Sequence, residues 1–104
     1  MNKEQIYKKL GSFKRVDNIL SNKGNHISNE FVLYYENGTI FQSYKSIIAV
    51  VFNTFKSVDN PYYLGVDWDY SKTTRKYRDI FLNSNKKTIE EDLKNGVAIL
   101  INDL

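Results

Sequence analysis

One stretch decides how the second half of this chain folds: DWDYSKTTRKYRDIFL, residues 67–82. Ser71 is of a type that caps helix N-termini, and apolar residues recur after it at helical spacing. The pattern predicts a helix from Ser71 to Asn83 with one aromatic face and one basic face. Asp67 and Asp69 come just before this start, where negative charge is stabilising because the first helical N–H groups are partly positive.

The two faces of this predicted helix follow from its periodicity. One side carries Tyr70, Thr73, Thr74, Tyr77, Ile80, Phe81 and Ser84. The other side carries Lys72, Arg75, Lys76, Asp79 and Asn83. We therefore expect the first side to pack against a sheet and the second to face water or a partner.

A β-hairpin is predicted upstream of the helix, from the runs Glu30–Tyr35 and Thr39–Tyr44. Between the runs stands Asn37-Gly38, a dipeptide that readily adopts the positive φ of a type I′ turn. A two-residue turn there predicts three pairs on one face of the sheet. These pairs are Tyr35 with Ile40, Leu33 with Gln42, and Phe31 with Tyr44.

The remaining segments complete a single α+β domain over residues 1–104. Ile47–Phe52 is apolar throughout, which is typical of a central strand. Further strands are predicted at Phe13–Leu20, Tyr62–Val66 and Val97–Ile101, and short helices at Asn2–Leu10, capped by Asn2, and Ile89–Lys94, capped by Thr88 and ended by Gly96. We expect a mainly antiparallel sheet of four or five strands, packed by the main helix at 71–83 and by the short N- and C-terminal helices. The predicted core is Phe31, Leu33, Ile47, Ile48, Val50, Val51, Phe52, Leu64, Val66, Trp68, Tyr77, Ile80 and Phe81.

Composition excludes several kinds of site and of protein. The chain has no cysteine, so disulfides, thiolate zinc sites and cysteine nucleophiles are ruled out. The longest purely apolar run, Ile47–Phe52, is far too short to cross a membrane, and Met1–Leu10 lacks the apolar segment of a signal peptide. We expect a cytoplasmic protein without membrane contact, either a monomer or a homodimer paired through the apolar tail Val97–Leu104.

Charge is segregated along the chain although the net charge is only +3. Residues 1–24 hold six basic and two acidic side chains, and residues 72–87 hold six and one. Residues 25–71 and 88–104 are both net acidic. Such a dipolar surface can steer a polyanion or an oppositely charged protein patch. The alternative is an ordinary mixed-charge surface that keeps the protein soluble.

Residues that could carry catalysis are few. His26 is the only histidine, and no Gly-x-Ser-x-Gly sequence accompanies it, so a Ser-His-Asp site is rejected. Asp67 and Asp69 point the same way if they lie on a strand, and with Lys72 nearby they suggest a Mg²⁺-dependent nuclease. A third acidic ligand is not placed by the sequence, so helix capping is the favoured interpretation. No catalytic residue, metal ligand or cofactor is predicted.

A binding surface is the stronger prediction. Lys72, Arg75 and Lys76, with Arg78 on their flank, form a basic face along which a nucleic-acid backbone or a protein partner could lie. Three tyrosines could stack an exposed base: Tyr62, Tyr63 and Tyr70. The alternative is a solvated helix face that is paired with nearby acids.

Two segments resemble a family of small uncharacterised phage and prophage proteins. FQSYKSIIA (41–49) matches its Ser-Tyr-x-x-x-Ile-Ala strand, and WDYSKTT (68–74), with the helix that follows to Leu82, matches its aromatic-Asp-Tyr-Ser-x-Thr-Thr helix start. The resemblance covers residues 30–82. Because the family often carries His where this chain has Tyr77, no catalytic role is transferred to that position.

The resemblance implies a mobile-element protein that is expressed in the cytoplasm of an infected or lysogenic bacterium. Small proteins of that origin often bind and block a host machine, as anti-restriction and anti-CRISPR inhibitors do. We therefore expect a non-catalytic inhibitor that binds a host protein or ribonucleoprotein complex in defence or nucleic-acid processing. The alternatives are a nucleic-acid-binding accessory protein that uses the basic block 72–87, and the metal-dependent nuclease at Asp67 and Asp69.

Overall fold

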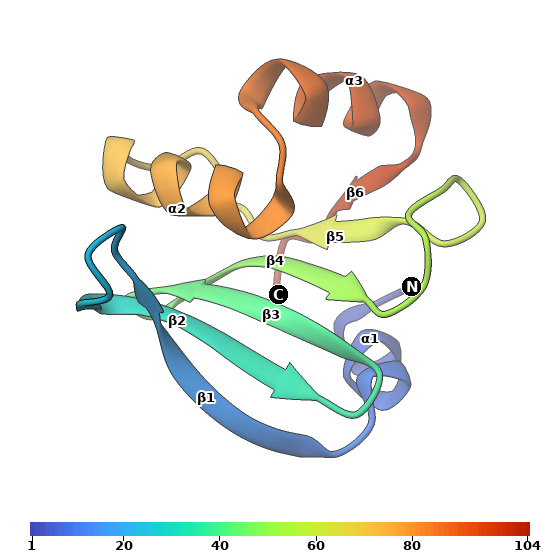
Figure 1. Cartoon of the computed structure of the whole chain (residues 1–104). Helices are drawn as coiled ribbons and strands as arrows, with labels where there is room; N and C mark the ends of the chain where they lie inside the picture. Colours follow the sequence, from blue (N-terminus) through green and yellow to red (C-terminus); the bar gives the residue numbers. More distant parts are fainter.

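Six strands form one sheet in chain order, from β1 to β6, in the computed structural model, which describes residues 1–104 (Figure 1). The strands are β1 (Phe13–Leu20), β2 (His26–Tyr35), β3 (Gly38–Ser43), β4 (Ser46–Phe52), β5 (Tyr62–Leu64) and β6 (Ala98–Leu100). Neighbouring strands are antiparallel except β5 and β6, which are parallel. The helices are α1 (Lys3–Leu10), α2 (Lys72–Leu82) and α3 (Lys86–Asn95). The predicted α+β class is confirmed, with six strands instead of four or five.

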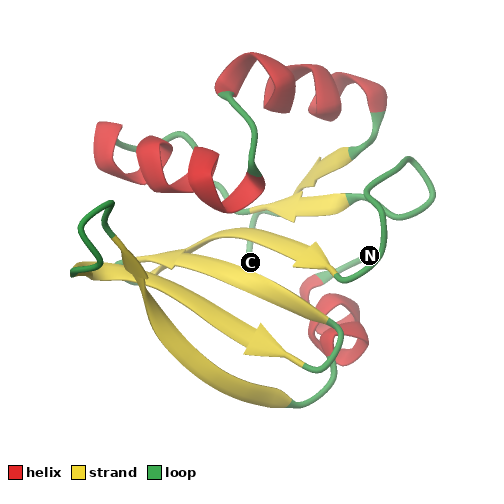
Figure 2. Cartoon of the chain, viewed as in Figure 1, coloured by secondary structure: helices red, strands yellow, loops and turns green.

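The helices lie on both faces of the sheet (Figure 2). On one face, Ile6 and Leu10 of α1 pack in a cluster with Ile40, Val50, Phe52 and Tyr63. On the other face, Leu82 of α2 and Ile89 of α3 pack with Ala49, Tyr62, Leu64 and Ala98. A third cluster joins Tyr77 of α2 to Ile19, Phe41 and Ile48. Because side chains alternate along each strand, β3, β4 and β5 contribute to both faces.

The predicted N-cap residues are confirmed for two of the three helices. Asn2 Oδ1 accepts a 2.9 Å hydrogen bond from Gln5 N, and Ser71 Oγ accepts one of 3.1 Å from Thr74 N. The predicted start of the last helix at Thr88 is wrong. Asn85 caps α3 instead, because its Oδ1 accepts a 2.9 Å hydrogen bond from the Thr88 N–H.

The β2–β3 hairpin has a different register from the one predicted. Leu33 pairs with Ile40 and Phe31 with Gln42, a shift of two residues that leaves each side chain on its expected face. Neither Asn37 nor Gly38 has positive φ. The turn is held from outside, because the Asn37 N–H donates to the carbonyl of Leu10 at the end of α1. Gly38 is required by close approach, since a Cβ there would lie 2.6 Å from the Val51 carbonyl oxygen.

The predicted core is confirmed in its centre and wrong at its margins. Ile48, Val50, Phe52, Leu64 and Tyr77 are buried. Val66 and Ile80 are instead 57% and 58% exposed, because Val66 lies in the turn after β5 and Ile80 lines an open hollow between α2 and the β1–β2 hairpin. The other predicted core residues are half-buried: Phe31, Leu33, Ile47, Val51, Trp68 and Phe81.

Two further features bear on the predicted partners. No helix of this fold has the length and apolar character needed to cross a bilayer. The C-terminal tail is folded back, since Ile101 and Leu104 pack against the α1 cluster. β6 is an edge strand of the sheet. The predicted homodimer would pair through this edge.

Candidate functional site

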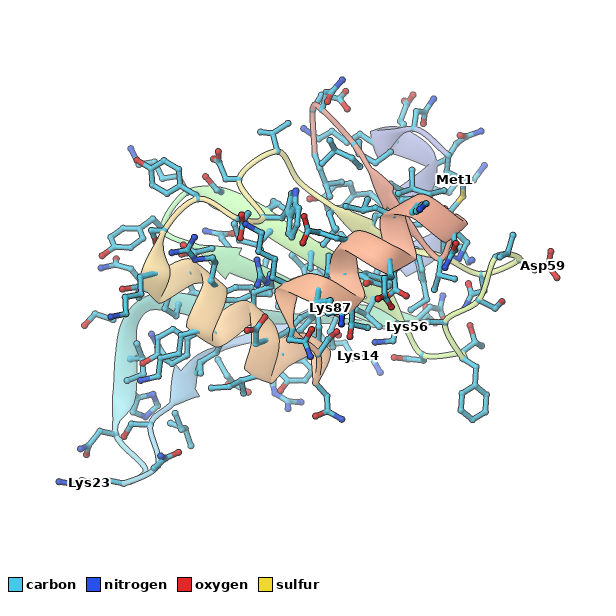
Figure 3. All side chains as sticks on the ribbon, turned by 90° about the horizontal axis from the view of Figure 1, so that it is seen from above. Met1, Lys14, Lys23, Lys56, Asp59 and Lys87 are labelled. Atoms are coloured by element: carbon cyan, nitrogen blue, oxygen red, sulfur yellow. The ribbon has the colours of Figure 1, made fainter.

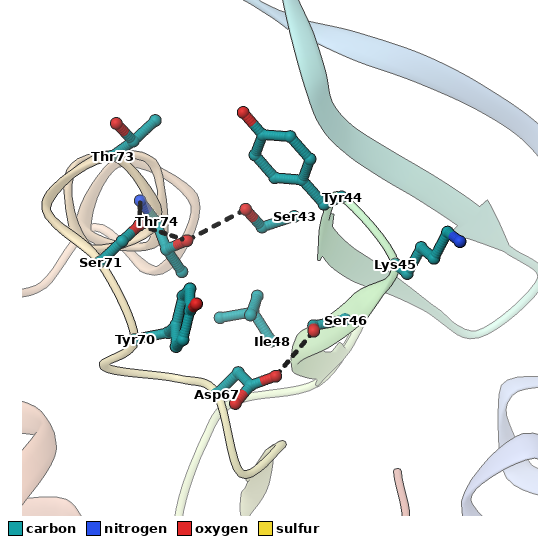
Figure 4. A pocket seen from close by; sticks show the side chains of 10 residues that line it. All are labelled: Ser43, Tyr44, Lys45, Ser46, Ile48, Asp67, Tyr70, Ser71, Thr73 and Thr74. Carbon is teal, nitrogen blue, oxygen red and sulfur yellow. Dashed lines mark hydrogen bonds between the residues drawn. The ribbon is translucent and has the colours of Figure 1, made fainter.

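A hollow of about 670 Å³ lies between the β3–β4 turn and the start of α2 (Figure 4). Its size is within the range of small-ligand sites, roughly 300–1,000 Å³. The two segments that carry the resemblance, 41–49 and 68–74, form its walls. Its lining is Ser43, Tyr44, Lys45, Ser46, Ile48, Asp67, Tyr70, Ser71, Thr73 and Thr74.

A chain of hydroxyl groups runs from the lining of this hollow to a buried carboxyl group. Ser71 Oγ donates to Thr74 Oγ1 at 3.0 Å, and Thr74 Oγ1 lies 3.1 Å from Ser43 Oγ. Ser43 Oγ in turn donates to Glu30 Oε1 at 2.9 Å. These bonds join β2, β3 and the first turn of α2, so they hold the two walls of the hollow together.

Glu30, at the end of this chain, is a buried acid with an unsatisfied atom. The residue is fully buried, and its Oε2 has no hydrogen-bond partner. Burial raises the pKa of the Glu30 carboxyl above its usual value, and the hydrogen bond from Ser43 opposes this only in part. The group is therefore easier to protonate than an ordinary glutamate.

Two tyrosines from different walls stand at the rim of the hollow (Figure 4). Tyr44 is 61% exposed and Tyr70 is 78% exposed, so both rings are open to a ligand. Tyr44 has a φ of +55°, a left-handed conformation that is uncommon for a bulky residue. Such backbone strain clusters at binding and switch sites.

The lining of the hollow includes one cationic residue, Lys45, and one carboxylate, Asp67. Lys45 has no ion-pair partner. Asp67 accepts a 2.7 Å hydrogen bond from Ser46 Oγ through Oδ2. With the hydroxyl groups of the tyrosines and Thr73, the site offers both donors and acceptors around a floor that includes the buried Ile48. Polar groups placed around an apolar floor are the arrangement by which such hollows orient a ligand.

Arg78 was predicted as part of the basic face, and that prediction is wrong. Its side chain is 1% exposed and lies 3.0 Å from Asp69 Oδ1 and 2.8 Å from Asp79 Oδ1. Its Nη1 also donates to the Trp68 carbonyl at 2.9 Å. The guanidinium group turns inward because these acceptors surround it, and its role is to fix the turn before α2.

The other predicted cations remain on the surface. Lys72 and Lys76 are exposed and Arg75 is half-buried, and none of the three forms an ion pair. Tyr70, one residue before the cap of α2, lies close to Lys72 in sequence and lines the hollow. The structure therefore brings Tyr70 together with part of the predicted basic face.

Two of the predicted stacking residues are not available to a base. Tyr62 and Tyr63 are only 1% and 3% exposed, because they point to opposite faces of β5 and both faces are covered. The Tyr62 hydroxyl donates a 2.6 Å hydrogen bond to Asp92 of α3. Burial, together with this bond to a carboxylate, raises the pKa of Tyr62 strongly.

The two acids considered for a metal site have separate partners. Asp67 and Asp69 lie in a turn, so the strand geometry that would align them is absent. Asp69 is held by Arg78 and by Lys86 at 2.8 Å. Burial alone would raise the pKa of Asp69, but these two cations outweigh it and hold the pKa below its usual value. No group of three or more acidic, histidine or cysteine side chains is placed to hold a metal ion. His26 is exposed at the start of β2.

A second exposed feature is the loop between β4 and β5, residues 53–61. Phe55 in this loop is 97% exposed, and Val58 is 64% exposed. Asn60 organises the loop from within: its Nδ2 donates to Thr54 Oγ1 and, at 3.0 Å, to the Phe55 carbonyl. Lys9 of α1 donates to Asn60 Oδ1 at 3.0 Å, and Lys56 donates to the Leu82 carbonyl at 3.3 Å. In Figure 3 the labelled Lys56 and Asp59 mark the inner and outer parts of this loop.

A family model matches residues 1–96 of the chain. The chain belongs to a family of unknown function (DUF8033). No curated protein and no solved structure matches it. The expectation of an uncharacterised family is thus confirmed, and the match extends well beyond residues 30–82.

Sequence reasoning missed several residues of these two surfaces in this DUF8033 member. Tyr44 was predicted to end a strand and to pair with Phe31, and Lys45 was given no role in a site, although a tyrosine between polar residues at a turn has no core to enter. Phe55 is a lone aromatic residue in a polar loop, which is the signal that could have identified it. The hydroxyl chain to Glu30 joins residues far apart in sequence and leaves no local signal.

Proposed function

We propose that this protein acts by binding and not by catalysis. Its role would be that of a phage or mobile-element inhibitor that binds a host defence or nucleic-acid-processing complex in the bacterial cytoplasm. The observation that carries this proposal is the ordered 53–61 loop with its exposed Phe55. The resemblance to small phage and prophage proteins supports the mobile-element setting.

An exposed phenylalanine on an ordered loop is a good anchor for a protein partner. Aromatic side chains that enter a partner's pocket often contribute about 2 kcal/mol or more to binding. Because Asn60 and Lys56 already hold the loop, less conformational entropy is lost when it docks. The partner should therefore present an apolar pocket that accepts the Phe55 ring.

The test is capture of a complex from the natural bacterial host. Tagged wild-type protein should retain a defined protein complex after nuclease treatment and should inhibit its activity in a purified assay. Phe55→Ala should reduce both at least about tenfold, the effect of losing one anchor residue. Phe13→Ala, which truncates a half-exposed phenylalanine at the start of β1, is the matched control and should retain both. Equal capture by the Phe55→Ala variant would contradict the proposal.

A second candidate function is nucleic-acid binding as an accessory protein. The specific observation in its favour is that Lys72, Arg75 and Lys76 have no acidic partner, so their charge is free for phosphate. Reversal of all three to Glu should abolish a gel shift with DNA or RNA. Loss of host-complex capture on nuclease treatment would favour this candidate over the first.

A further inference from the structure

Two hollows follow one another along the same side of α2. Thr73 lines the first hollow, and Lys76, Tyr77 and Ile80 line the second. Residues separated by three, four and seven positions share one face of a helix, so these four form a single stripe. The stripe extends the site from Tyr70 toward the C-terminal half of α2.

The opposite wall of the second hollow is the tip of the β1–β2 hairpin. This hollow has a volume of about 240 Å³ and is lined there by Leu20, Ser21, Asn22 and Lys23. Lys23 lies at the outer end of the hairpin tip (Figure 3). The side of α2 that carries the stripe therefore faces the β3–β4 turn at one end and the hairpin tip at the other.

Charge along this path is almost purely positive. Lys23, Lys45, Lys72 and Lys76 lie on or beside it, and none forms an ion pair. Asp67 is the only carboxylate that lines either hollow, and it already accepts a hydrogen bond from Ser46. Free cations near exposed aromatic rings are complementary to a phosphate backbone with accessible bases.

We propose that this side of α2 is a binding track for single-stranded nucleic acid. One unstacked base lies on the Tyr70 ring in the first hollow, with Tyr44 on the other wall, and the backbone follows Lys72, Lys76 and Lys23. The inference rests on the second candidate function. It adds that the nucleic acid is single-stranded and that one base stacks on Tyr70. A duplex does not fit this role, because its bases are stacked inside and cannot reach Tyr70.

The experiment measures fluorescence anisotropy of labelled 12-nucleotide DNA and RNA of mixed sequence, single-stranded and as a duplex, at several salt concentrations. Single strands should bind more tightly than the duplex, with little dependence on sequence. Tyr70→Ala should weaken single-strand binding by about 5- to 150-fold, because one base–aromatic stack contributes roughly 1–3 kcal/mol. The Tyr70 side chain is 78% exposed, so this variant should fold like the wild type.

Charge variants separate the backbone contacts from the base contact. Lys76→Glu and Lys23→Glu should each weaken binding and reduce the steepness of its salt dependence. Lys3→Glu, on α1 at the opposite face of the sheet, makes the same charge change and should leave affinity nearly unchanged.

Three outcomes would overturn the inference, and they differ in what they say of the function. In the first outcome, duplex and single strand bind equally, and binding is lost in the Lys72, Arg75 and Lys76 triple variant but unchanged in Tyr70→Ala. This result would support nucleic-acid binding but contradict the proposed single-strand track. Absence of binding to any nucleic acid at low salt would overturn both. Tighter binding of a polyglutamate peptide than of either strand, lost in Lys76→Glu, would assign the track to an acidic protein segment.

Discussion

Arg78 and Asp69 form an ion pair that ties the middle of α2 to the turn before it. Arg78 Nη1 lies 3.0 Å from Asp69 Oδ1, and the arginine side chain is 1% exposed. The same guanidinium group also binds Asp79 and the Trp68 carbonyl. Because Tyr70 and Ser71 follow directly after Asp69, this pair helps to place the wall of the first hollow.

Replacement of Arg78 should therefore destabilise the whole protein. Arg78→Ala leaves Asp79 and the Trp68 carbonyl without this donor and leaves Asp69 with Lys86 as its remaining partner. We expect a loss of about 3 kcal/mol in the free energy of unfolding. Urea denaturation measures the change. Arg75→Ala, one turn away in a position without an ion pair, should alter stability by less than about 0.5 kcal/mol. A loss of similar size in both variants would show that the buried ion pair is not responsible.

Asp69 should contribute to acid sensitivity. Its pKa is lowered in the folded state, so the stability that it provides is present above its unfolded pKa of about 3.8 and is lost as the pH falls through the lower folded value. Asp69→Asn should be less stable than the wild type at neutral pH and should lose less stability on acidification below about pH 4. The measurement is urea denaturation across this range. Asp59→Asn, in the exposed 53–61 loop, makes the same charge change and should follow the wild-type curve.

Glu30 should show the opposite pH dependence. Because burial raises its pKa in the folded state, the folded protein holds this proton more tightly, and stability falls as the pH rises from the unfolded pKa of about 4.5 through the folded one. Glu30→Gln removes the buried charge and should raise stability at neutral pH by about 1 kcal/mol. The gain should shrink toward zero at acidic pH, where the wild-type carboxyl group is protonated. A variant that is less stable than the wild type at neutral pH would show that the ionised carboxylate stabilises the hydroxyl chain.

The order of the 53–61 loop should depend on Asn60. Asn60→Ala removes its hydrogen bonds to Thr54, Phe55 and Lys9 while leaving Phe55 in place. Amide hydrogen exchange within residues 53–60 should become at least about tenfold faster, with no matching change in the core of β4. Unchanged exchange in the loop would mean that Lys56 and the backbone hydrogen bonds between Ser57 and Asn60 are enough to hold it.

The parts of this fold that depend on local sequence were predictable. Ser71 caps α2 and Asn2 caps α1 through neighbours three residues away, so a one-dimensional pattern contains all that is needed. The hairpin was predicted with its faces correct and its register wrong, because the turn is held by the distant carbonyl of Leu10. The register therefore depends on α1, which no pattern in residues 30–44 reveals.

The candidate site was only partly predictable for the same physical reason. Lys72 and Lys76 were identified because exposure follows helix periodicity. The same periodicity placed Tyr70 on the side expected to pack against the sheet, and Tyr70 was proposed only as a tyrosine that could stack a base. Arg78 was placed on the wrong side of α2, because its burial depends on Asp69 and the Trp68 carbonyl folding over it. Tyr62 and Tyr63 were predicted to be accessible because tyrosine is amphipathic. They belong to the core because both faces of β5 are covered, which the local sequence does not reveal.

The parallel pair of β5 and β6 has a consequence for the order in which the chain folds. The five strands β1 to β5 join neighbours in sequence, whereas β6 reaches β5 only after the 33 residues from Gly65 to Val97 have formed the two-helix crossover. Contacts of such long separation form slowly, because the intervening loop must close first. During synthesis β5 would remain an open edge until β6 has emerged, and in that interval the nascent chain is most exposed to pairing with its neighbours.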